Sequence, residues 1–458
     1  MQAARTGGVQ PRRAAALVGD HMIMRIRPVL LVLFSVLAIA LTGSATASAQ
    51  ADEPEYTIVN PPLPALAIGG QPSTVLQGEL GGAGYIIEVP PAWNGELVMW
   101  AHGYRGEGSV LTVDPPSFGM RRHLLERGYA WAASSYDANG YDIESGVRST
   151  RELAKEFIGL VGKPERTYIG GVSMGGHITA RSVEQYPTLY DGALPLCGVV
   201  GDIELFDFFL DYTLTSQALA GIDAYPIPTD WATGVVPIIK ERLGIAAGPP
   251  NNELGEQFLA IVIEQSGGPR PGAEAAFEVW KDFLFSLPTP DDGLGLAFNP
   301  GRVATNVDTD YEPDAPVAID EVVERVEAED ERARRARSLH EIAHVEGRQR
   351  DPVLSLHNLG DLFVPFSMEQ YYALDAAANG RSDLLVQRAI RTAGHCEFSA
   401  AEITTAFDDL VRWVEDGVRP AGDDVLTPRV VADPSYGCRF TDEASYPTGS
   451  RGLFEPWP

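Results

Sequence analysis

The middle of the chain alternates short runs of consecutive apolar residues with longer segments in which apolar residues recur every three or four positions. Runs of the first kind predict buried strands, and segments of the second kind predict helices that pack against them. The predicted strands span residues 84–90, 96–102, 130–135, 167–171, 194–200, 352–358 and 384–390. Two predicted helices begin at Met120 and directly after Ser173. Two more begin at Ser149 and Ser399, and each of these serines is followed three residues later by the glutamate of a capping box. This alternation predicts an α/β fold with a mostly parallel sheet covered by helices on both faces.

The alternation stops between residues 202 and 348, where we find helical patterns and no convincing strand. The helices predicted there span residues 203–219, 235–243, 253–265, 273–287 and 320–344. Because the sheet pattern resumes afterwards, we interpret residues 202–348 as a helical cap inserted into a core made of residues 50–201 and 349–420. Residues 50–80 are Pro-rich and are expected to be irregular, and residues 421–458 form a Pro-rich C-terminal extension.

The first part of the chain, residues 1–49, has the pattern of a secretory signal peptide. Arg25 and Arg27 form its basic end, residues 29–41 form its apolar run, and a small-residue cleavage site ends at Ala49. The apolar run is too short to span a bilayer comfortably. We therefore expect a protein that is secreted to the extracellular space or the periplasm, with no membrane partner after cleavage of the signal.

Acidic residues greatly outnumber basic ones, 63 against 35, which gives a formal net charge of −28. A surface of this sign repels phosphate groups, so the charge argues against nucleic acid or an anionic membrane as a partner. The apolar fraction of 45% is ordinary for a soluble globular protein.

The segment 166–180 reads RTYIGGVSMGGHITA and predicts a short strand, a tight turn and the start of a helix. Residues 171–175 match G-x-S-x-G, in which a strained strand-to-helix turn exposes a serine hydroxyl over the end of a parallel sheet. A side chain at Gly171 or Gly175 would collide with a neighbouring strand or helix at so sharp a bend. Ser173 is therefore the predicted nucleophile.

A serine hydroxyl becomes a good nucleophile only when a base takes its proton, and an acid must hold that base in the right tautomer. Of the eight histidines, His395 fits the base best because it lies in a loop directly after the last predicted strand. Asp361 fits the acid best because it follows the next-to-last strand, and Asp202, after the strand before that, is the alternative. The order Ser173, Asp361, His395 is the Ser, acid, His order of the α/β-hydrolase fold.

On these motifs the chain resembles secreted bacterial serine hydrolases, of the esterase and amidase kind, in the α/β-hydrolase superfamily. The resemblance covers about residues 80–200 and 350–420. It implies that the pair His102-Gly103, after an early strand, helps to shape an oxyanion hole. The backbone N–H of Met174 and one from Gly103 or Tyr104 would then stabilise the tetrahedral oxyanion.

Three cysteines, Cys197, Cys396 and Cys438, lie beyond the predicted signal, and an exported protein can keep disulfides. Cys197 lies inside an apolar run and is most simply a buried thiol, so Cys396 and Cys438 are the expected pair. Tannase and feruloyl esterase relatives place one cysteine after the histidine, as here, and another directly before the serine. This chain has Val172 at the second place, so that particular disulfide is not expected.

A possible zinc site is the pattern H-E-x-x-H formed by His340, Glu341 and His344. On a helix this spacing puts both imidazoles on one face, as zinc proteases require. Arg350 stands where the third histidine of an extended motif belongs, and arginine stays protonated and does not ligate zinc. We therefore keep a zinc metalloprotease only as a remote alternative.

A second metal pattern consists of Asn306, Asp308 and Asp310, alternating oxygen ligands of the calcium-loop kind. Tyr311 stands where a calcium loop needs glycine, and Val317 stands where it needs the closing glutamate. We interpret the segment as solvated acids on a linker. The sequence therefore predicts neither a metal nor another cofactor.

The predicted cap is rich in aromatic residues, namely Phe206, Phe208, Phe209, Tyr212, Phe277, Trp280, Phe283 and Phe285. Many of them will pack the cap's own helices, but a cap above Ser173 would present some to the substrate. That favours an apolar or aromatic acyl group. We therefore expect a small-molecule carboxylic ester as substrate, cleaved through an acyl-enzyme on Ser173. An amide is the second expectation, because the same triad cleaves both, and a non-catalytic binding protein on the same fold is the third.

Overall fold

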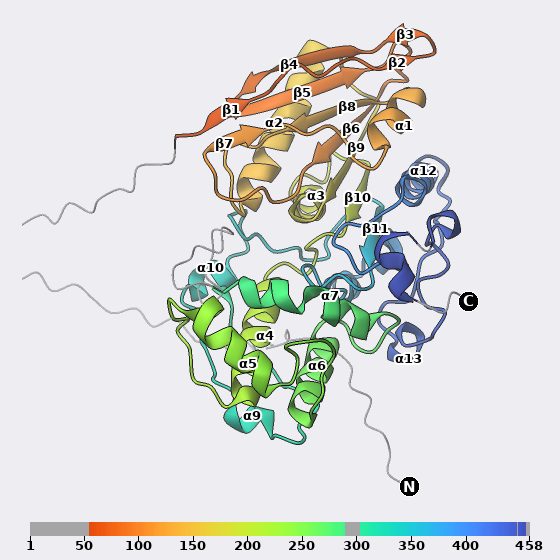
Figure 1. The fold of residues 1–458 in the computed structure, drawn as a ribbon. Coiled ribbons are helices and arrows are strands. Elements are labelled where there is room, and N and C mark those ends of the chain that lie inside the picture. The colour runs from red at the N-terminus through yellow and green to blue at the C-terminus, as the bar shows by residue number, and fades with distance from the viewer. Residues whose placement is uncertain (1–54, 289–302, 447, 455–458) are drawn as a thin grey trace, which may run out of the picture. The chain divides into compact units, whose positions relative to one another are not determined.

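The computed structural model describes residues 55–288, 303–446 and 448–454, so the predicted signal peptide lies outside the described residues. The central element is an eight-stranded sheet (Figure 1). In the order in which they lie side by side, its strands are β12 (Leu385–Ile390), β11 (Val353–Asn358), β10 (Gly192–Leu196), β9 (Arg166–Val172), β6 (Glu96–Ala101), β8 (Ala130–Ser134), β5 (Ala83–Val89) and β4 (Thr74–Leu80). Of these, β5 runs antiparallel to both its neighbours, and the other pairs are parallel.

Helices cover both faces of the sheet because its central strands bury side chains on both sides. Successive side chains of a strand point to opposite faces. On β6, Leu97 and Met99 pack into one apolar layer, and Val98 and Trp100 pack into the other. The first layer is covered by α2 (Ile143–Leu160) and α3 (Met174–Gln185), and the second by α1 (Met120–Glu126) and α12 (Ala400–Asp416). This architecture confirms the predicted α/β-hydrolase fold.

The predicted strands all occur in the sheet, but helix starts were predicted less well. The capping box of α12 is present, with the Ser399 hydroxyl accepting the Glu402 N–H at 3.2 Å. The second predicted capping box is wrong, because α2 begins earlier. The Asp142 carboxylate accepts the Ser145 N–H at 2.8 Å and caps the helix, which leaves Ser149 inside it.

The described part of residues 202–348 contains helices and no strand. The helices are α4 (Glu204–Ala220), α5 (Val236–Arg242), α6 (Glu253–Gln265), α7 (Ala273–Ser286), α9 (Ile319–Val322) and α10 (Glu331–Arg335). Figure 1 shows this group, and α4 packs against α5, α6, α7 and α9. The long helix predicted over residues 320–344 is wrong, because only α9 and α10 form there. Beyond α10 the chain leaves the helix, and there His344 bonds Asp202 at 2.8 Å and the Arg334 carbonyl at 2.7 Å, so tertiary contacts override helix propensity in this segment.

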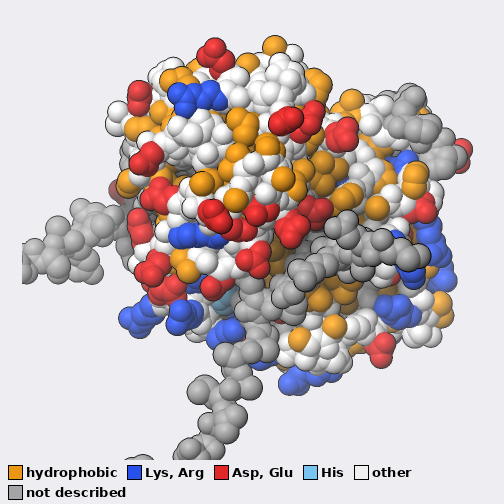
Figure 2. All heavy atoms as spheres, turned by 90° about the horizontal axis from the view of Figure 1, so that it is seen from below, with side chains coloured by type: hydrophobic (Ala, Val, Ile, Leu, Met, Phe, Trp, Pro, Cys, Tyr) orange, Lys and Arg blue, Asp and Glu red, His pale blue; other side chains and the backbone are white. Residues whose placement is uncertain are grey.

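Several short elements complete the described chain, and some were not predicted. They are β1 (Thr57–Val59), β2 (Ala67–Ile68), β3 (Gln71–Pro72), β7 (Val110–Thr112), α11 (Ser367–Ala378) and α13 (Pro428–Val431). No helix within residues 55–288, 303–446 and 448–454 has the length and apolarity needed to cross a bilayer. Asp and Glu side chains lie across the face drawn in Figure 2, in keeping with the net charge of −28.

Candidate active site

Ser173 lies at the sharp turn between β9 and α3, at the carboxyl end of the parallel strands. Its backbone has φ 58° and ψ −122°, a strained conformation for a residue with a side chain. The neighbouring glycines make the turn possible. A Cβ atom at Gly171 would lie 2.4 Å from the carbonyl oxygen of Gly175, and one at Gly175 would lie 2.2 Å from that of Ala101. The predicted nucleophile turn is therefore present, with glycine required at both flanking positions.

The three groups of the predicted triad lie within hydrogen-bonding distance of one another. His395 Nδ1 lies 2.6 Å from Asp361 Oδ2, and His395 Nε2 lies 2.8 Å from Ser173 Oγ. A carboxylate only accepts, so Nδ1 carries the proton and donates it to Asp361. Nε2 is then the acceptor for the serine hydroxyl. The imidazole is thus held in the tautomer that a general base needs.

The acid is held by the loop that follows β11. The second oxygen of Asp361 accepts the N–H groups of Phe363 and Val364, at 2.9 and 3.0 Å. The imidazole of the buried His357 bonds the carbonyl oxygen of Val364 at 2.8 Å and so fixes the same loop. Asp361 itself is fully buried, so its negative charge is stabilised by these donors and by His395 rather than by water.

The backbone of the predicted oxyanion-hole residues Met174 and Gly103 lies next to Ser173. Met174 is the first residue of α3, and the first N–H groups of a helix have no partner within it. Gly103 lies against the serine, because a Cβ atom on it would be 3.7 Å from Ser173 Oγ. Burial lowers the pKa of His102 to about 4, so its imidazole is neutral at pH 7. Its Nδ1 lies 2.7 Å from the Gly103 carbonyl oxygen and its Nε2 lies 3.2 Å from that of Ser135, contacts that hold the loop that carries Gly103 and Tyr104.

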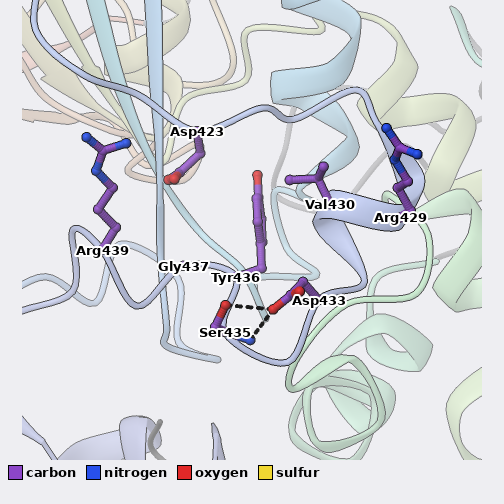
Figure 3. Close-up of a pocket in the computed structure, with 8 residues that line it drawn as sticks. All are labelled: Asp423, Arg429, Val430, Asp433, Ser435, Tyr436, Gly437 and Arg439. Atoms are coloured by element: carbon purple, nitrogen blue, oxygen red, sulfur yellow. Dashed lines mark hydrogen bonds between the residues drawn. The ribbon is translucent and has the colours of Figure 1, made fainter.

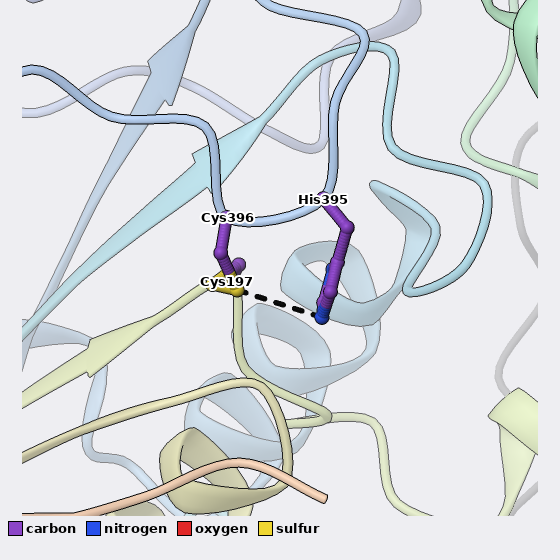
Figure 4. Close-up of side chains that lie close together, drawn as sticks. All are labelled: Cys197, His395 and Cys396. Carbon is purple, nitrogen blue, oxygen red and sulfur yellow. Dashed lines mark hydrogen bonds between the residues drawn. A yellow bond between two sulfur atoms is a disulfide. The ribbon is translucent and has the colours of Figure 1, made fainter. Parts of the chain in front are cut away.

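The predicted disulfide between Cys396 and Cys438 is wrong. The structure joins Cys197 to Cys396, with their Cα atoms 5.3 Å apart (Figure 4). Cys438 is a free, half-buried cysteine. Cys197 follows β10, and Cys396 lies in the loop after β12. Only β11 lies between these two parallel strands in the sheet, so both cysteines lie at the same edge of it. The apolar surroundings of Cys197 indicated burial correctly but did not exclude a disulfide.

Both sulfur atoms of this disulfide lie near the imidazole of His395, and Cys396 Sγ is 3.5 Å from Nε2. The three side chains form the one cluster of metal-ligating groups found among the described residues. Zinc binds cysteine as the thiolate, and neither sulfur is a thiolate while the disulfide is intact. The disulfide therefore ties the loop of His395 to the end of β10.

The alternative acid and the H-E-x-x-H residues belong to a separate buried network. Asp202 Oδ1 lies 2.8 Å from His344 Nδ1, and its other oxygen accepts the Val345 N–H at 2.9 Å. His344 Nε2 bonds the carbonyl oxygen of Arg334 at 2.7 Å, so both of its ring nitrogens have protein partners. Residues 340–344 are not helical, and the spacing that zinc proteases use is not formed.

The residues of the calcium-like pattern do not converge. Asn306 is fully buried, and its amide oxygen accepts the Val326 N–H at 2.7 Å while its nitrogen donates to the Glu324 carbonyl at 2.7 Å. Asp308 and Asp310 are exposed. Asn306 therefore organises the loop rather than a cation site.

A small apolar cavity opens beside the nucleophile. It has a volume of about 20 Å³, room for roughly one water molecule. It is lined by Tyr104, Tyr141, Ser173, Val199, Leu205, Phe206, Phe209, Phe363 and Val364. The Tyr141 hydroxyl bonds His177 Nδ1 at 2.9 Å, whereas the Tyr104 hydroxyl is buried without a hydrogen-bond partner in the described chain. Tyr104 therefore brings an uncommitted donor to a mostly apolar cavity.

A larger and more open cavity, of about 460 Å³, lies in the C-terminal extension (Figure 3). Its lining residues are Asp423, Arg429, Val430, Asp433, Ser435, Tyr436, Gly437 and Arg439. None of them belongs to the triad, and the Asp433 carboxylate is already bonded by the Ser435 hydroxyl at 2.6 Å. We assign this cavity no part in the chemistry at Ser173.

Sequence reasoning missed some residues at the site. Phe363 lies two positions after the acid and places its ring 5.2 Å from that of His395, at 70°. Tyr141 lines the cavity from the start of the chain segment that leads into α2. Neither residue belongs to a sequence motif. Phe363 could have been found more easily because it follows Asp361 by two residues.

Comparison with known proteins gives one match in sequence and several in structure. No protein-family model matches the chain. An o-phthalyl amidase of Xanthobacter agilis is 23% identical over 400 residues, which cover 74% of this chain and 87% of the amidase.

Two of the similar solved structures show the range of the structural matches. The feruloyl esterase B of Aspergillus oryzae is 14% identical with a TM-score of 0.45, over 77% of this chain and 82% of the esterase. An acylaminoacyl peptidase of Pyrococcus horikoshii is 11% identical with a TM-score of 0.36, over 77% of this chain and 43% of the peptidase. The strand order of the sheet and the strand–turn–helix that carries Ser173 show an α/β-hydrolase fold, and over 400 residues the chain is similar in sequence to an amidase.

Proposed function

We propose that the protein is a serine hydrolase that forms an acyl-enzyme on Ser173, with His395 as the base and Asp361 as the acid. The observation that supports this most directly is the pair of short contacts made by one imidazole, 2.8 Å to the serine oxygen and 2.6 Å to the carboxylate. This geometry makes a non-catalytic binding protein the weaker explanation of the same fold.

In the proposed mechanism, Ser173 Oγ attacks the carbonyl carbon while its proton moves to His395 Nε2. The carbonyl oxygen becomes an oxyanion and accepts hydrogen bonds from the N–H of Met174 and from that of Gly103 or Tyr104. As the tetrahedral intermediate collapses, Nε2 gives the proton to the leaving group, and the acyl group stays on Ser173. Water then attacks the acyl-enzyme by the same route in reverse, with His395 taking the water proton and returning one to Ser173.

The substrate we propose is a small ester or amide with an aromatic or other apolar acyl group. The cavity beside Ser173 supports this, because Leu205, Phe206 and Phe209 leave few polar atoms to receive a polar chain. The similarity to an o-phthalyl amidase supports an aromatic acyl group. It also supports an amide as substrate as strongly as an ester. Tyr104, with its free hydroxyl, would donate to a polar substituent on such a ring.

A matched set of substrates tests the proposal. We expect the purified protein to hydrolyse benzoyl and phthalyl esters, and the corresponding anilides more slowly. Ser173→Ala should abolish both activities, while Ser182→Ala, a change at a second buried serine in the same helix, should leave both measurable. Activity that survives in Ser173→Ala would contradict the proposal, and so would an absence of turnover on every ester and amide in the set.

We also propose that the protein acts outside the cytosol. The Cys197–Cys396 disulfide supports this, since disulfides persist mainly in oxidising compartments. The signal-like pattern at residues 1–49 is the second support. The measurement is the intact mass of the protein recovered from culture medium or periplasm, which should correspond to cleavage near Ala49. Recovery of the uncleaved chain from the cytosol alone would contradict this proposal.

A further inference from the structure

Two groups of aromatic residues on the helices of the predicted cap and the loop after β11 differ in their surroundings. One set, in the interior of the predicted cap, consists of Tyr212, Phe258, Phe277 and Phe285, which contact one another and are almost fully buried. The other set, which we call the rim cluster, consists of Trp280, Phe283 and Phe363. Trp280 and Phe363 are half-buried, and Phe283 is 36% exposed. The interior set packs the helices against one another, whereas the rim cluster leaves aromatic surface exposed to solvent beside the active site.

The rim cluster is built from two separate parts of the chain and is held in place. Phe283 and Phe363 have ring centroids 4.9 Å apart at 77°, an edge-to-face contact, and Trp280 lies 5.3 Å from Phe283. The indole N–H of Trp280 donates to the carbonyl oxygen of Ala393 at 2.6 Å, two residues before His395. Phe363 belongs to the acid loop, and α7 carries the other two. The cluster is therefore fixed to both loops that supply the triad.

The chemistry assigns a direction to each part of the substrate. In the tetrahedral intermediate the oxyanion lies at the N–H of Met174 and that of Gly103 or Tyr104, and the leaving atom must lie within reach of His395 Nε2, which protonates it. Phe363 is the ring that packs against the imidazole of His395, at 5.2 Å. Phe363 also lines the cavity beside Ser173, whereas Phe283 and Trp280 do not, so the leaving group departs past Phe363 toward those two rings. The acyl group takes the remaining direction, into the cavity beside Ser173.

We propose that Trp280, Phe283 and Phe363 form a leaving-group subsite that favours an aromatic alcohol or amine portion of the substrate. This inference rests on the proposed acyl-enzyme function of Ser173 and adds the substrate class on the leaving side. Phe283, which is 36% exposed, and the half-buried Trp280 receive the leaving-group ring by edge-to-face or offset stacking. The subsite acts during acylation, because the leaving group has gone before deacylation begins.

That timing gives a test with an internal control. Benzyl benzoate and methyl benzoate carry the same acyl group, so both pass through the same benzoyl-enzyme. We expect Phe283→Ala to lower kcat/KM for the benzyl ester about tenfold, the scale of a lost aromatic contact, and for the methyl ester less than twofold. The rate of deacylation, measured by single-turnover decay of the benzoyl-enzyme, should not change. Phe283→Tyr, which keeps the ring, should restore most of the benzyl preference.

A neighbouring residue provides the matched control variant. Val279 lies on α7 next to the cluster and is 47% exposed, but it makes no ring contact. Val279→Ala should leave kcat/KM for both esters unchanged. Equal losses on the two esters in Phe283→Ala, or a changed deacylation rate, would overturn the subsite while leaving the hydrolase function intact. If the wild-type protein hydrolyses neither ester and Ser173 resists a fluorophosphonate, the proposed function fails and the subsite fails with it.

Discussion

The two candidate acids, Asp361 and Asp202, differ in the imidazole that each one faces. Both are buried and both follow a strand of the same sheet, so sequence position left them as alternatives. In the structure Asp361 bonds His395, whereas Asp202 bonds His344 and the backbone of residues 203 and 345. The first pair serves the serine, and the second joins the chain before α4 to the chain before β11.

Replacing each acid by its amide should therefore give opposite results. Asp361→Asn removes the acceptor that fixes the tautomer of His395, and we expect kcat to fall by about a thousandfold or more with little change in the melting temperature. Asp202→Asn weakens the buried hydrogen bonds of Asp202 with His344 and the backbone, so the free energy of unfolding should fall by about 3 kcal/mol while kcat of the folded enzyme stays close to wild type. Steady-state kinetics and urea denaturation measure the two quantities. A large kcat loss in Asp202→Asn alone would reverse the assignment.

Strand ends and helix starts explain which parts of the site the sequence could predict. The nucleophile turn was predictable because residues 171–175 carry all of its steric requirements locally. The pairing of Cys197 with Cys396 was not, since it depends on the order of the strands in the sheet and joins residues 199 positions apart in the chain. The start of α2 was placed too late because Ser149 and Glu152 imitate a cap, while the true cap is Asp142. Strand β4 was missed because its context is Pro-rich.

Helix α3 carries a second testable feature, the buried His177 one turn after the nucleophile. Its Nε2 donates to the Ala343 carbonyl at 2.6 Å, and burial lowers its pKa from 6.5 to about 4. At pH values between about 4 and 6.5, His177 is protonated in the unfolded chain and neutral in the folded one. The free energy of unfolding therefore falls as the pH drops through this window. For this one group the loss is on the order of 3 kcal/mol.

His177→Gln removes the titrating group while keeping a donor. The variant should be less stable than wild type at pH 7, and the difference in free energy of unfolding should shrink as the pH approaches 4, because only the wild type loses this contribution. Urea denaturation of both proteins at several pH values measures the difference. A gap that stays constant from pH 7 to pH 4 would mean that His177 is not held neutral by burial.

At the scale of the whole molecule, two distant segments, the end of β10 and helix α7, both hold the loop that carries His395. Cys197–Cys396 fixes the loop of His395 to the sheet, and Trp280 reaches the same loop from α7. The cavity beside Ser173 is too small for an aromatic ring in this arrangement, so side chains such as Phe209 and Phe363 must shift when substrate enters. The sequence predicted aromatic residues near the serine, but their division into interior and rim sets depends on packing between distant segments.

Loss of the disulfide should lower the free energy of unfolding of the protein. The bond closes a loop with a sequence separation of 199, for which the chain-entropy model gives about 5 kcal/mol of stabilisation. We expect the double variant Cys197→Ser/Cys396→Ser to unfold at a clearly lower urea concentration than wild type, and Cys438→Ser to match wild type. Thiol titration of the denatured, unreduced wild-type protein should find one free thiol, at Cys438. Three free thiols, or a Cys438→Ser variant as weak as the double one, would contradict the disulfide assignment.

The covalent intermediate on Ser173 is the centre of the account, and mass spectrometry observes it directly. The protein would be mixed with an activated benzoyl ester, quenched in acid within the first turnover, and digested. We predict a benzoyl group on the peptide that contains Ser173, absent from Ser173→Ala and accumulating in Asp361→Asn if deacylation is slowed more than acylation. Full turnover in the wild type with no acyl group on that peptide at any quench time, or with the group on another residue, would contradict the account.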